Sequence, residues 1–248
     1  MTRNEDLDSY QDAYQPDFKF DSENLSTLDW YSRRMCHDMR TLGTQSVLSL
    51  GIGHRVVSQN IEKEFSENLS SHTILEGSKE IIENYKAKYG KHQNVDIIHT
   101  YFEEFETEQR FDAIEAGFVM EHVDDPHEVL GHIKKFVVPG GKIYLAVPNA
   151  TSLHRQIGNK AGLLDDMYKL SEYDLQLGHK RYFDVESFKQ LAKDCGLQIV
   201  KVEGIYLKPV TTSQIESLEL TDDVMRALYE MGLAYPELCN SIYMETVA

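Results

Sequence analysis

Short apolar runs alternate with amphipathic segments between residues 46 and 148. Compact apolar runs predict strands, and apolar residues that recur every three or four positions predict helices. A regular alternation of the two predicts a parallel sheet covered on both faces, and therefore an α/β fold. The predicted strands are SVLSL (46–50), HTILEG (72–77), VDIIHT (95–100), FDAIEAG (111–117) and GKIYLAVP (141–148), and the predicted helices cover residues 56–68, 78–90 and 125–137.

The segments that flank this alternation have different patterns. Residues 1–25 carry aromatic rather than aliphatic side chains, which predicts an irregular arm, and the helix that follows ends at Gly43. Residues 151–183 are polar and mixed, which predicts short helices inserted between elements of the sheet. Beyond them we predict a helix at 184–196, two short strands about Gly204 and an amphipathic helix at 221–238.

We therefore predict three regions in the chain. Residues 1–44 form the arm and its helix, which could close as a lid, and residues 45–208 form the core, with an insert at about 151–183 that caps the substrate. Residues 209–248 form a helical extension. The sheet should have seven mostly parallel strands, with one antiparallel strand in its last hairpin. The apolar stretch GLAYPELCNSIY is expected to cover a sheet edge or to form a dimer contact.

A glycine turn follows the first predicted strand. Gly51 and Gly53 permit a tight turn whose backbone N–H groups can approach a ligand at the start of the next helix. Glu76 closes the next strand, where an acid accepts hydrogen bonds from ribose hydroxyls in nucleotide-binding sheets; it could otherwise be a helix N-terminal charge beside Ser78. A dinucleotide site requires a third glycine, and Val56 occupies that position.

Two longer stretches carry a family resemblance. EAGFVMEHVDDPHEVLGHIKKFVVPGGKIYLAVPNATSLHR and GHKRYFDVESFKQLAKDCGLQIVKVEG resemble class I S-adenosylmethionine-dependent methyltransferases, in the small-molecule branch that includes ubiquinone-biosynthesis O-methyltransferases and sugar methyltransferases. The resemblance covers roughly residues 45–208. It implies a three-layer Rossmann-like methyltransferase fold, S-adenosylmethionine as cofactor and S-adenosylhomocysteine as product. It also implies methyl transfer to a hydroxyl, less readily an amine, of a small polar metabolite such as a sugar, a glycan precursor or a natural-product intermediate.

The resemblance assigns cofactor contacts residue by residue. The glycine turn passes beneath the methionine and ribose, an acid binds the ribose, the residues after the third strand line the adenine, and the end of the fourth strand lies beside the reactive methyl. The matching positions here are Gly51, Gly53, Glu76, Tyr101, Phe102, Gly117 and Phe118.

The glycine motif also departs from the family pattern. Ser49 stands where the family has an acid that helps to hold the methionine ammonium, and Arg55 replaces the final glycine of the loop. Glu115 or Glu121 could supply the missing negative charge. An alternative is a relative that binds the cofactor without turnover, and a less favoured one is an NAD(P)-dependent oxidoreductase.

The acceptor needs a base near the carboxyl ends of the fourth and fifth strands or in the insert. We favour His154 or His179 over His122, which could instead buttress its loop. Asn149 could equally cap a turn, and the GHKRYF cluster could be a solvated face. The candidate catalytic residues are thus His154, His179 and His122, and the candidate substrate contacts are Asn149, Arg155, Arg181, Tyr182 and Tyr14.

A metal site is not expected from the segment HVDDPH. It offers His122, Asp124, Asp125 and His127, but Asp125 followed by Pro126 fits the start of a helix. We therefore predict no metal.

Composition limits the partners further. The chain has 25 Lys and Arg against 41 Asp and Glu, a formal net charge of −16, which argues against a nucleic-acid partner. No apolar run approaches the ~20 residues of a membrane span, and the polar N-terminus does not match a signal peptide. Three cysteines without a CxxC motif suggest reduced thiols. We expect a cytoplasmic monomer or homodimer that acts on a small molecule, with no membrane partner.

Overall fold

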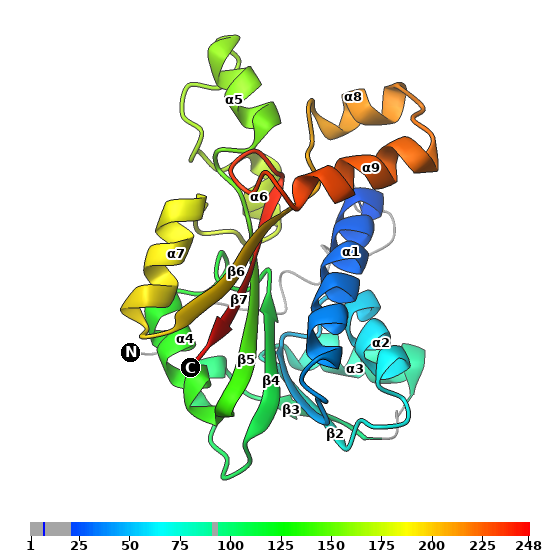
Figure 1. Ribbon diagram of the computed structural model, residues 1–248, viewed down its shortest axis with the longest axis vertical. Helices are drawn as coiled ribbons and strands as arrows, with labels where there is room; N and C mark the ends of the chain where they lie inside the picture. The colour runs from blue at the N-terminus through cyan, green and yellow to red at the C-terminus, as the bar shows by residue number, and fades with distance from the viewer. Residues whose placement is uncertain (1–6, 8–20, 91–93) are drawn as a thin grey trace.

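The computed structural model describes residues 7, 21–90 and 94–248 of the chain. Seven strands form one sheet in the order β3-β2-β1-β4-β5-β7-β6 (Figure 1). The strands are β1 (Ser46–Leu50), β2 (Ser71–Glu76), β3 (Val95–His99), β4 (Phe111–Gly117), β5 (Val137–Pro148), β6 (Gln198–Ile205) and β7 (Ser241–Val247). Strands β1 to β5 pair in parallel, whereas β7 pairs antiparallel with both β5 and β6.

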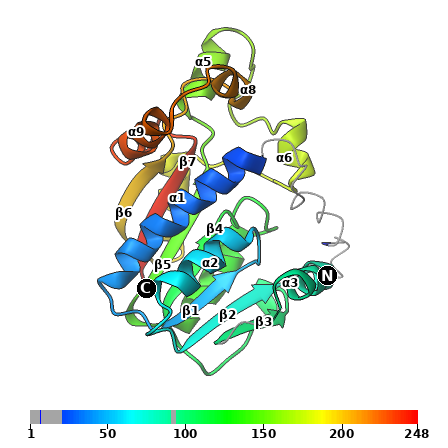
Figure 2. The ribbon, with the colours of Figure 1, turned by 90° about the vertical axis from the view of Figure 1, so that its right-hand side faces the viewer.

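Helices cover both faces of this sheet. In Figure 1, α1 and α2 lie on one side and α4 and α7 on the other, and Figure 2 shows α1, α2 and α3 on the same face. The helices are α1 (Asp21–Arg40), α2 (Arg55–Glu64), α3 (Lys79–Tyr89), α4 (Pro126–Ile133), α5 (Leu153–Lys160), α6 (Glu172–Gln176), α7 (Val185–Asp194), α8 (Thr212–Ser217) and α9 (Asp222–Gly232), with short 3-10 turns η2 (Phe102–Glu104) and η3 (Lys134–Phe136). The predicted three-layer α/β fold is therefore confirmed.

Side-chain caps fix where several helices begin. The Ser78 hydroxyl accepts a hydrogen bond from the backbone N–H of Ile81 at the start of α3. The carboxylate of Asp125 accepts from the N–H of His127 at 2.8 Å, and Pro126 occupies the first turn of α4. Each cap satisfies a backbone donor that the helix itself leaves unpaired. The interpretation of Asp125–Pro126 as a helix start is confirmed.

The C-terminal part of the chain differs from the prediction. Residues 198–205 form one strand rather than two, and Gly204 is a point of close packing, since an added Cβ would lie 2.4 Å from the Sγ atom of Cys239. The antiparallel strand does not come from a hairpin, because α8 and α9 separate β6 from β7. Strand β7 lies inside the sheet, so the end of GLAYPELCNSIY is part of an internal strand and does not cover a sheet edge.

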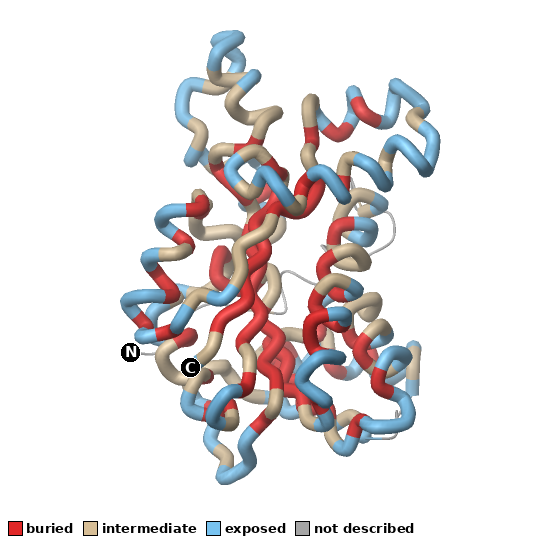
Figure 3. Tube along the Cα trace, viewed as in Figure 1, coloured by how far each residue is buried: buried red, intermediate tan, exposed pale blue. Residues whose placement is uncertain are grey.

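Burial follows the middle of the sheet. In Figure 3 the buried residues run along the central strands and the inner side of α1. One apolar cluster joins the sheet to α4 and α7, and a second joins it to α1, α2 and α9. None of the helices in the described ranges has both the length and the apolar character needed to cross a bilayer.

Candidate functional site

A cavity of about 610 Å³ opens at the carboxyl edge of the parallel strands. The ends of β1, β2, β4 and β5 form its floor, and segments near α1, α6 and α8 contribute to its walls. This edge is where open α/β sheets bind their ligands. The volume lies within the range of small-molecule sites.

The glycine turn and the acid of the second strand meet on this floor. Gly51 has a φ of +83° and Gly53 a φ of +49°, conformations that favour glycine. The Glu76 carboxylate accepts hydrogen bonds from the backbone N–H of Ile52 at 3.0 Å and of Ser78 at 2.8 Å. Burial raises the pKa of Glu76, and the two N–H donors oppose that rise. A buried carboxylate fixed in this way can accept from a ligand's hydroxyl groups.

Arg55 leaves the space above the turn free. Its guanidinium lies 4.5 Å from the ring centre of Tyr89 and donates to the Tyr85 hydroxyl at 3.2 Å. Both tyrosines belong to α3, and Arg55 is not among the residues that line the cavity. The substitution of arginine for the family's glycine therefore does not fill the cavity.

Glu115 supplies a negative charge next to Ser49. The two residues are register partners on β4 and β1, and both line the cavity. The Glu115 Oε1 atom accepts from the Tyr31 hydroxyl at 3.0 Å and from the N–H of Gly117 at 2.8 Å. Burial raises the pKa of Glu115 to about 7.

The residues at the end of β4 are closely packed and include an unusual backbone conformation. Phe118 has a φ of +58°, a conformation that is uncommon for a bulky residue and is found mainly at functional sites. An added Cβ on Gly117 would lie 2.4 Å from the buried ring of Tyr31. Tyr101 and Phe102 line the same cavity after β3, so all seven positions assigned to the cofactor surround one space.

Two of the candidate catalytic histidines form a pair. The rings of His122 and His179 lie 4.8 Å apart, nearly perpendicular, and both line the cavity. The Nδ1 atom of His179 lies 3.3 Å from the Asp174 carboxylate. Burial and the neighbouring His179 lower the pKa of His122 to about 3, so its imidazole is neutral at pH 7.

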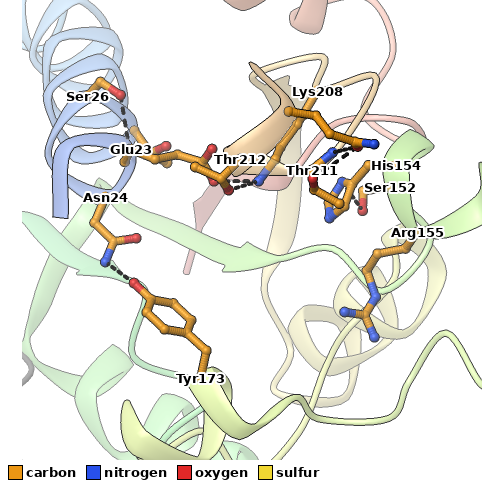
Figure 4. A network of polar contacts seen from close by, with 12 residues as sticks. Glu23, Asn24, Ser26, Ser152, His154, Arg155, Tyr173, Lys208, Thr211 and Thr212 are labelled. Atoms are coloured by element: carbon orange, nitrogen blue, oxygen red, sulfur yellow. Dashed lines mark hydrogen bonds and ion pairs between the residues drawn. The ribbon is translucent and has the colours of Figure 1, made fainter. Parts of the chain in front are cut away.

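His154 belongs to a second polar group on the α5 and α8 side of the cavity (Figure 4). Its Nδ1 atom lies 3.2 Å from the Ser152 hydroxyl, and burial together with Lys208 lowers its pKa to about 3. Buried Lys208 pairs with Glu23 of α1 at 2.6 Å and donates to Thr212 at 2.7 Å. This network joins the start of α1 to α8.

Of the candidate substrate contacts, Asn149, Arg155 and Tyr182 line the cavity, and Asn149, Arg155 and Arg181 also make structural contacts. Asn149 donates to the carbonyls of residues 236, 237 and 239 and accepts from Thr151, as a cap. Arg155 donates to the carbonyls of residues 167 and 169 and stacks over Tyr182 at 4.3 Å. Arg181 donates to the carbonyls of residues 120, 123 and 124 and does not line the cavity. Tyr14 lies outside the described residues.

Sequence reasoning missed three residues that contribute to the candidate site. Tyr31, which lies in the segment 1–44 predicted as a possible lid, is fully buried in the core and donates to Glu115. Lys208 and Asp174 carried no motif signal, because each gains its partners from segments far away in the chain. The spacing of apolar residues in α1 could have indicated that Tyr31 faces the sheet.

The geometry first defines a class of protein. An acid at a strand end beside a two-glycine turn fits the ribose of a nucleoside, and the lack of a third glycine in that turn disfavours a pyrophosphate. Glu115 then offers a charge for a cationic group at the far side of the turn. The chain is an α/β nucleoside-binding protein whose cavity continues past the nucleoside end to a group of histidines.

Residues 27–202 match the family described as a methyltransferase domain. Since this match covers more than half of the chain, the chain belongs to that family, the class I S-adenosylmethionine-dependent methyltransferases, and S-adenosylmethionine is its cofactor. This membership decides against the nicotinamide dinucleotide. The residues around the turn are compatible with S-adenosylmethionine, since Glu76 is a buried acceptor at the end of β2 and Glu115 is a carboxylate that lines the same cavity.

Individual relatives are distant. The chain is 26% identical to malonyl-acyl-carrier-protein O-methyltransferase 1 of Ilyobacter polytropus over 66% of its own length, and it spans 61% of that enzyme. It is 30% identical to the mitochondrial ubiquinone biosynthesis O-methyltransferase of Dictyostelium discoideum over 44% of its length and 33% of that protein. The structure of the plantazolicin methyltransferase BamL, solved with a triazolic desmethylPZN analogue and S-adenosylhomocysteine, has a TM-score of 0.60 at 17% identity and covers 97% of this chain and 90% of that one.

Proposed function

We propose that the protein transfers a methyl group from S-adenosylmethionine to a hydroxyl group of a small polar metabolite, such as a sugar, a glycan precursor or a natural-product intermediate. The observation that carries the proposal is the continuity of one cavity. It joins the nucleoside end at Glu76 to the histidine group at His122 and His179. O-Methyltransferase names among the sequence relatives favour oxygen over nitrogen as the acceptor atom.

In this proposal two carboxylates and the backbone of the glycine turn hold the cofactor. Glu76 accepts from the ribose hydroxyls, and the backbone of the turn, where Gly51 and Gly53 adopt positive φ, passes beneath the nucleoside. Ser49 occupies the position of the family's acid, and its neighbour Glu115 on β4 receives the methionine ammonium instead. Bound S-adenosylmethionine supplies an electrophilic methyl group on a sulfonium. Alignment of this group with the acceptor provides much of the rate.

The histidine end receives the acceptor. At pH 7 the imidazoles of His122 and His154 are neutral, because burial lowers the pKa of each to about 3. They therefore accept or donate hydrogen bonds to a hydroxyl but do not store its proton. His179, oriented by Asp174 at 3.3 Å, is the best placed of the three to take that proton. Residues of the segments around α6 and α8 also line this cavity.

Calorimetry and product analysis test the proposal. S-Adenosylmethionine and S-adenosylhomocysteine should each bind at one site per chain, and Glu76→Ala should weaken both at least 10-fold. Incubation with a library of hydroxylated metabolites and amines, followed by mass spectrometry, should reveal addition of a methyl group to an oxygen. Binding without any methylated product would support the non-catalytic alternative. Methylation confined to amines would refute the choice of oxygen.

A further inference from the structure

Three side chains with metal-binding atoms converge on the cavity wall after β4. One ligand atom from each of Glu121, His122 and His179 lies within 4.8 Å of the other two. The Nε2 atom of His122 lies 4.0 Å from the Glu121 carboxylate. All three residues line the cavity, and the His122 side chain keeps 35% of its surface exposed there.

Glu121 lacks the partners that a buried carboxylate normally has. The residue is fully buried, and neither carboxylate oxygen has a hydrogen-bond partner among the described residues. The neighbouring Arg181 guanidinium donates to backbone carbonyls instead. An unpaired buried charge is costly unless a cation or donor meets it, so this carboxylate is suited to a ligand that the protein does not itself provide.

The backbone brings the two segments of the cluster together. The N–H of Lys180 donates to the carbonyl of Glu121 at 2.8 Å, and the Arg181 side chain ties down the loop that carries His122. Asp174 lies 3.3 Å from Nδ1 of His179, an arrangement that orients the other ring nitrogen. A carboxylate behind a histidine is the usual outer partner of a metal-binding imidazole. Asp174 is itself held by Ser171 and Tyr182.

We propose that Glu121, His122 and His179 bind one divalent transition-metal ion, such as Zn²⁺, Mn²⁺ or Co²⁺, with its open coordination positions directed into the cavity. Two imidazoles and one carboxylate are a ligand set for such ions and leave room for substrate. Metal–ligand bonds of about 2.0–2.2 Å require the three atoms to approach each other by small side-chain rotations. The prediction of no metal considered only the segment 122–127, where Asp125 is a helix cap and Asp124 pairs with Lys180.

The role of the ion rests on the proposed function. A hydroxyl oxygen of the acceptor would bind an open position, which lowers the hydroxyl pKa so that its proton passes to solvent. The oxygen then forms a bond to the methyl carbon while the S–CH3 bond breaks, and its electron pair remains on the sulfur of S-adenosylhomocysteine. The ion is neither oxidised nor reduced. In the metal-bound protein His179 is a ligand of the ion, so it does not take the proton itself.

Cobalt titration of the full chain, stripped with a chelator, tests the site. The wild-type protein should bind one Co²⁺ per chain with visible d–d absorption, and Zn²⁺ should displace it. Glu121→Gln and His179→Gln should each weaken binding at least about 100-fold, since even loss of an outer partner costs roughly 10–100-fold. His127→Gln is the matched control, because His127 also lies near carboxylates, those of Asp125 and Asp194, but outside the cavity.

A second measurement covers variants that fold poorly. Zn²⁺ at a 100-fold excess over its Kd should raise the Tm of the wild type by roughly 5–10 °C, and leave that of Glu121→Gln unchanged. S-Adenosylhomocysteine affinity checks that each variant keeps its cofactor end. Absence of saturable one-to-one Co²⁺ binding, or binding that is unchanged in both variants, overturns the site. Metal binding without methylated products would overturn the proposed function alone.

Discussion

Glu115→Gln should stabilise the protein and weaken cofactor binding at the same time. The glutamine Oε1 can still accept from the Tyr31 hydroxyl and the Gly117 N–H, so the packing is kept and only the charge is lost. Glu115 is 4% exposed, and burial raises its pKa from 4.5 to about 7. At about 1.4 kcal/mol per pKa unit, this rise corresponds to about 3 kcal/mol.

The sign of the stability effect follows from proton binding. Between pH 4.5 and about 7 the folded protein keeps the Glu115 proton that the unfolded chain has lost. The free energy of unfolding of the wild type therefore falls as pH rises through this window and stays lower above it. Glu115→Gln has no carboxylate to titrate at this position, so its free energy of unfolding does not fall in this way. The difference in free energy of unfolding between the variant and the wild type should therefore grow by up to about 3 kcal/mol between about pH 5 and about pH 8.

Urea denaturation at these two pH values measures the first effect, and calorimetry with S-adenosylhomocysteine at about pH 8 measures the second. Loss of a hydrogen bond between charged groups costs about 1.5–3 kcal/mol, so affinity should fall roughly 10- to 150-fold. The exposed Glu83 on α3 provides a control as Glu83→Gln. A stability difference that does not vary with pH would refute the titration of a buried carboxylate. Unchanged affinity would refute its contact with the ammonium.

Three further substitutions test other parts of the structure. Gly117→Ala should lower stability by about 1–3 kcal/mol in thermal denaturation, because its Cβ would overlap the Tyr31 ring, and an unchanged Tm would contradict that contact. Burial lowers the pKa of His72 to about 4, so the wild type should lose up to about 3 kcal/mol as pH falls from 6.5 toward 4. In urea denaturation, the free energy of unfolding of His72→Gln should fall less than that of the wild type over this pH range. Equal pH dependence in the two proteins would refute the prediction. Arg181→Lys should cost about 1–3 kcal/mol in the same urea assay, since lysine cannot reproduce the fork of hydrogen bonds, and equal stability would show that the fork is dispensable.

Local signals made the core of the fold predictable. Strands β1 to β5 and the helices between them follow from apolar periodicity, and the Asp125 cap follows from residue chemistry within one turn. The positions at Gly51, Gly53 and Glu76 came from a motif whose parts are fixed by the backbone of two adjacent strands. Each of these signals is contained in a short stretch of sequence.

Contacts between distant segments were beyond such reasoning. The burial of β7 between β5 and β6 depends on the path of α8 and α9, which no local pattern encodes. The meeting of Glu121 with His179 likewise depends on how the insert returns to the end of β4. Arg181, named from the polar cluster GHKRYF, holds backbone carbonyls instead, because arginine can bind a ligand or a carbonyl and its sequence context does not distinguish the two.

The position of β7 has a consequence for how the protein is made. On the ribosome, β6 has no neighbour, and β5 lacks one of its two, until residues 241–247 have been translated and released. Nascent chains therefore carry unsatisfied strand edges, which favour aggregation, from the emergence of β5 until that of β7. A stop codon between residues 206 and 240 should yield insoluble product even though every residue of the cofactor turn is present.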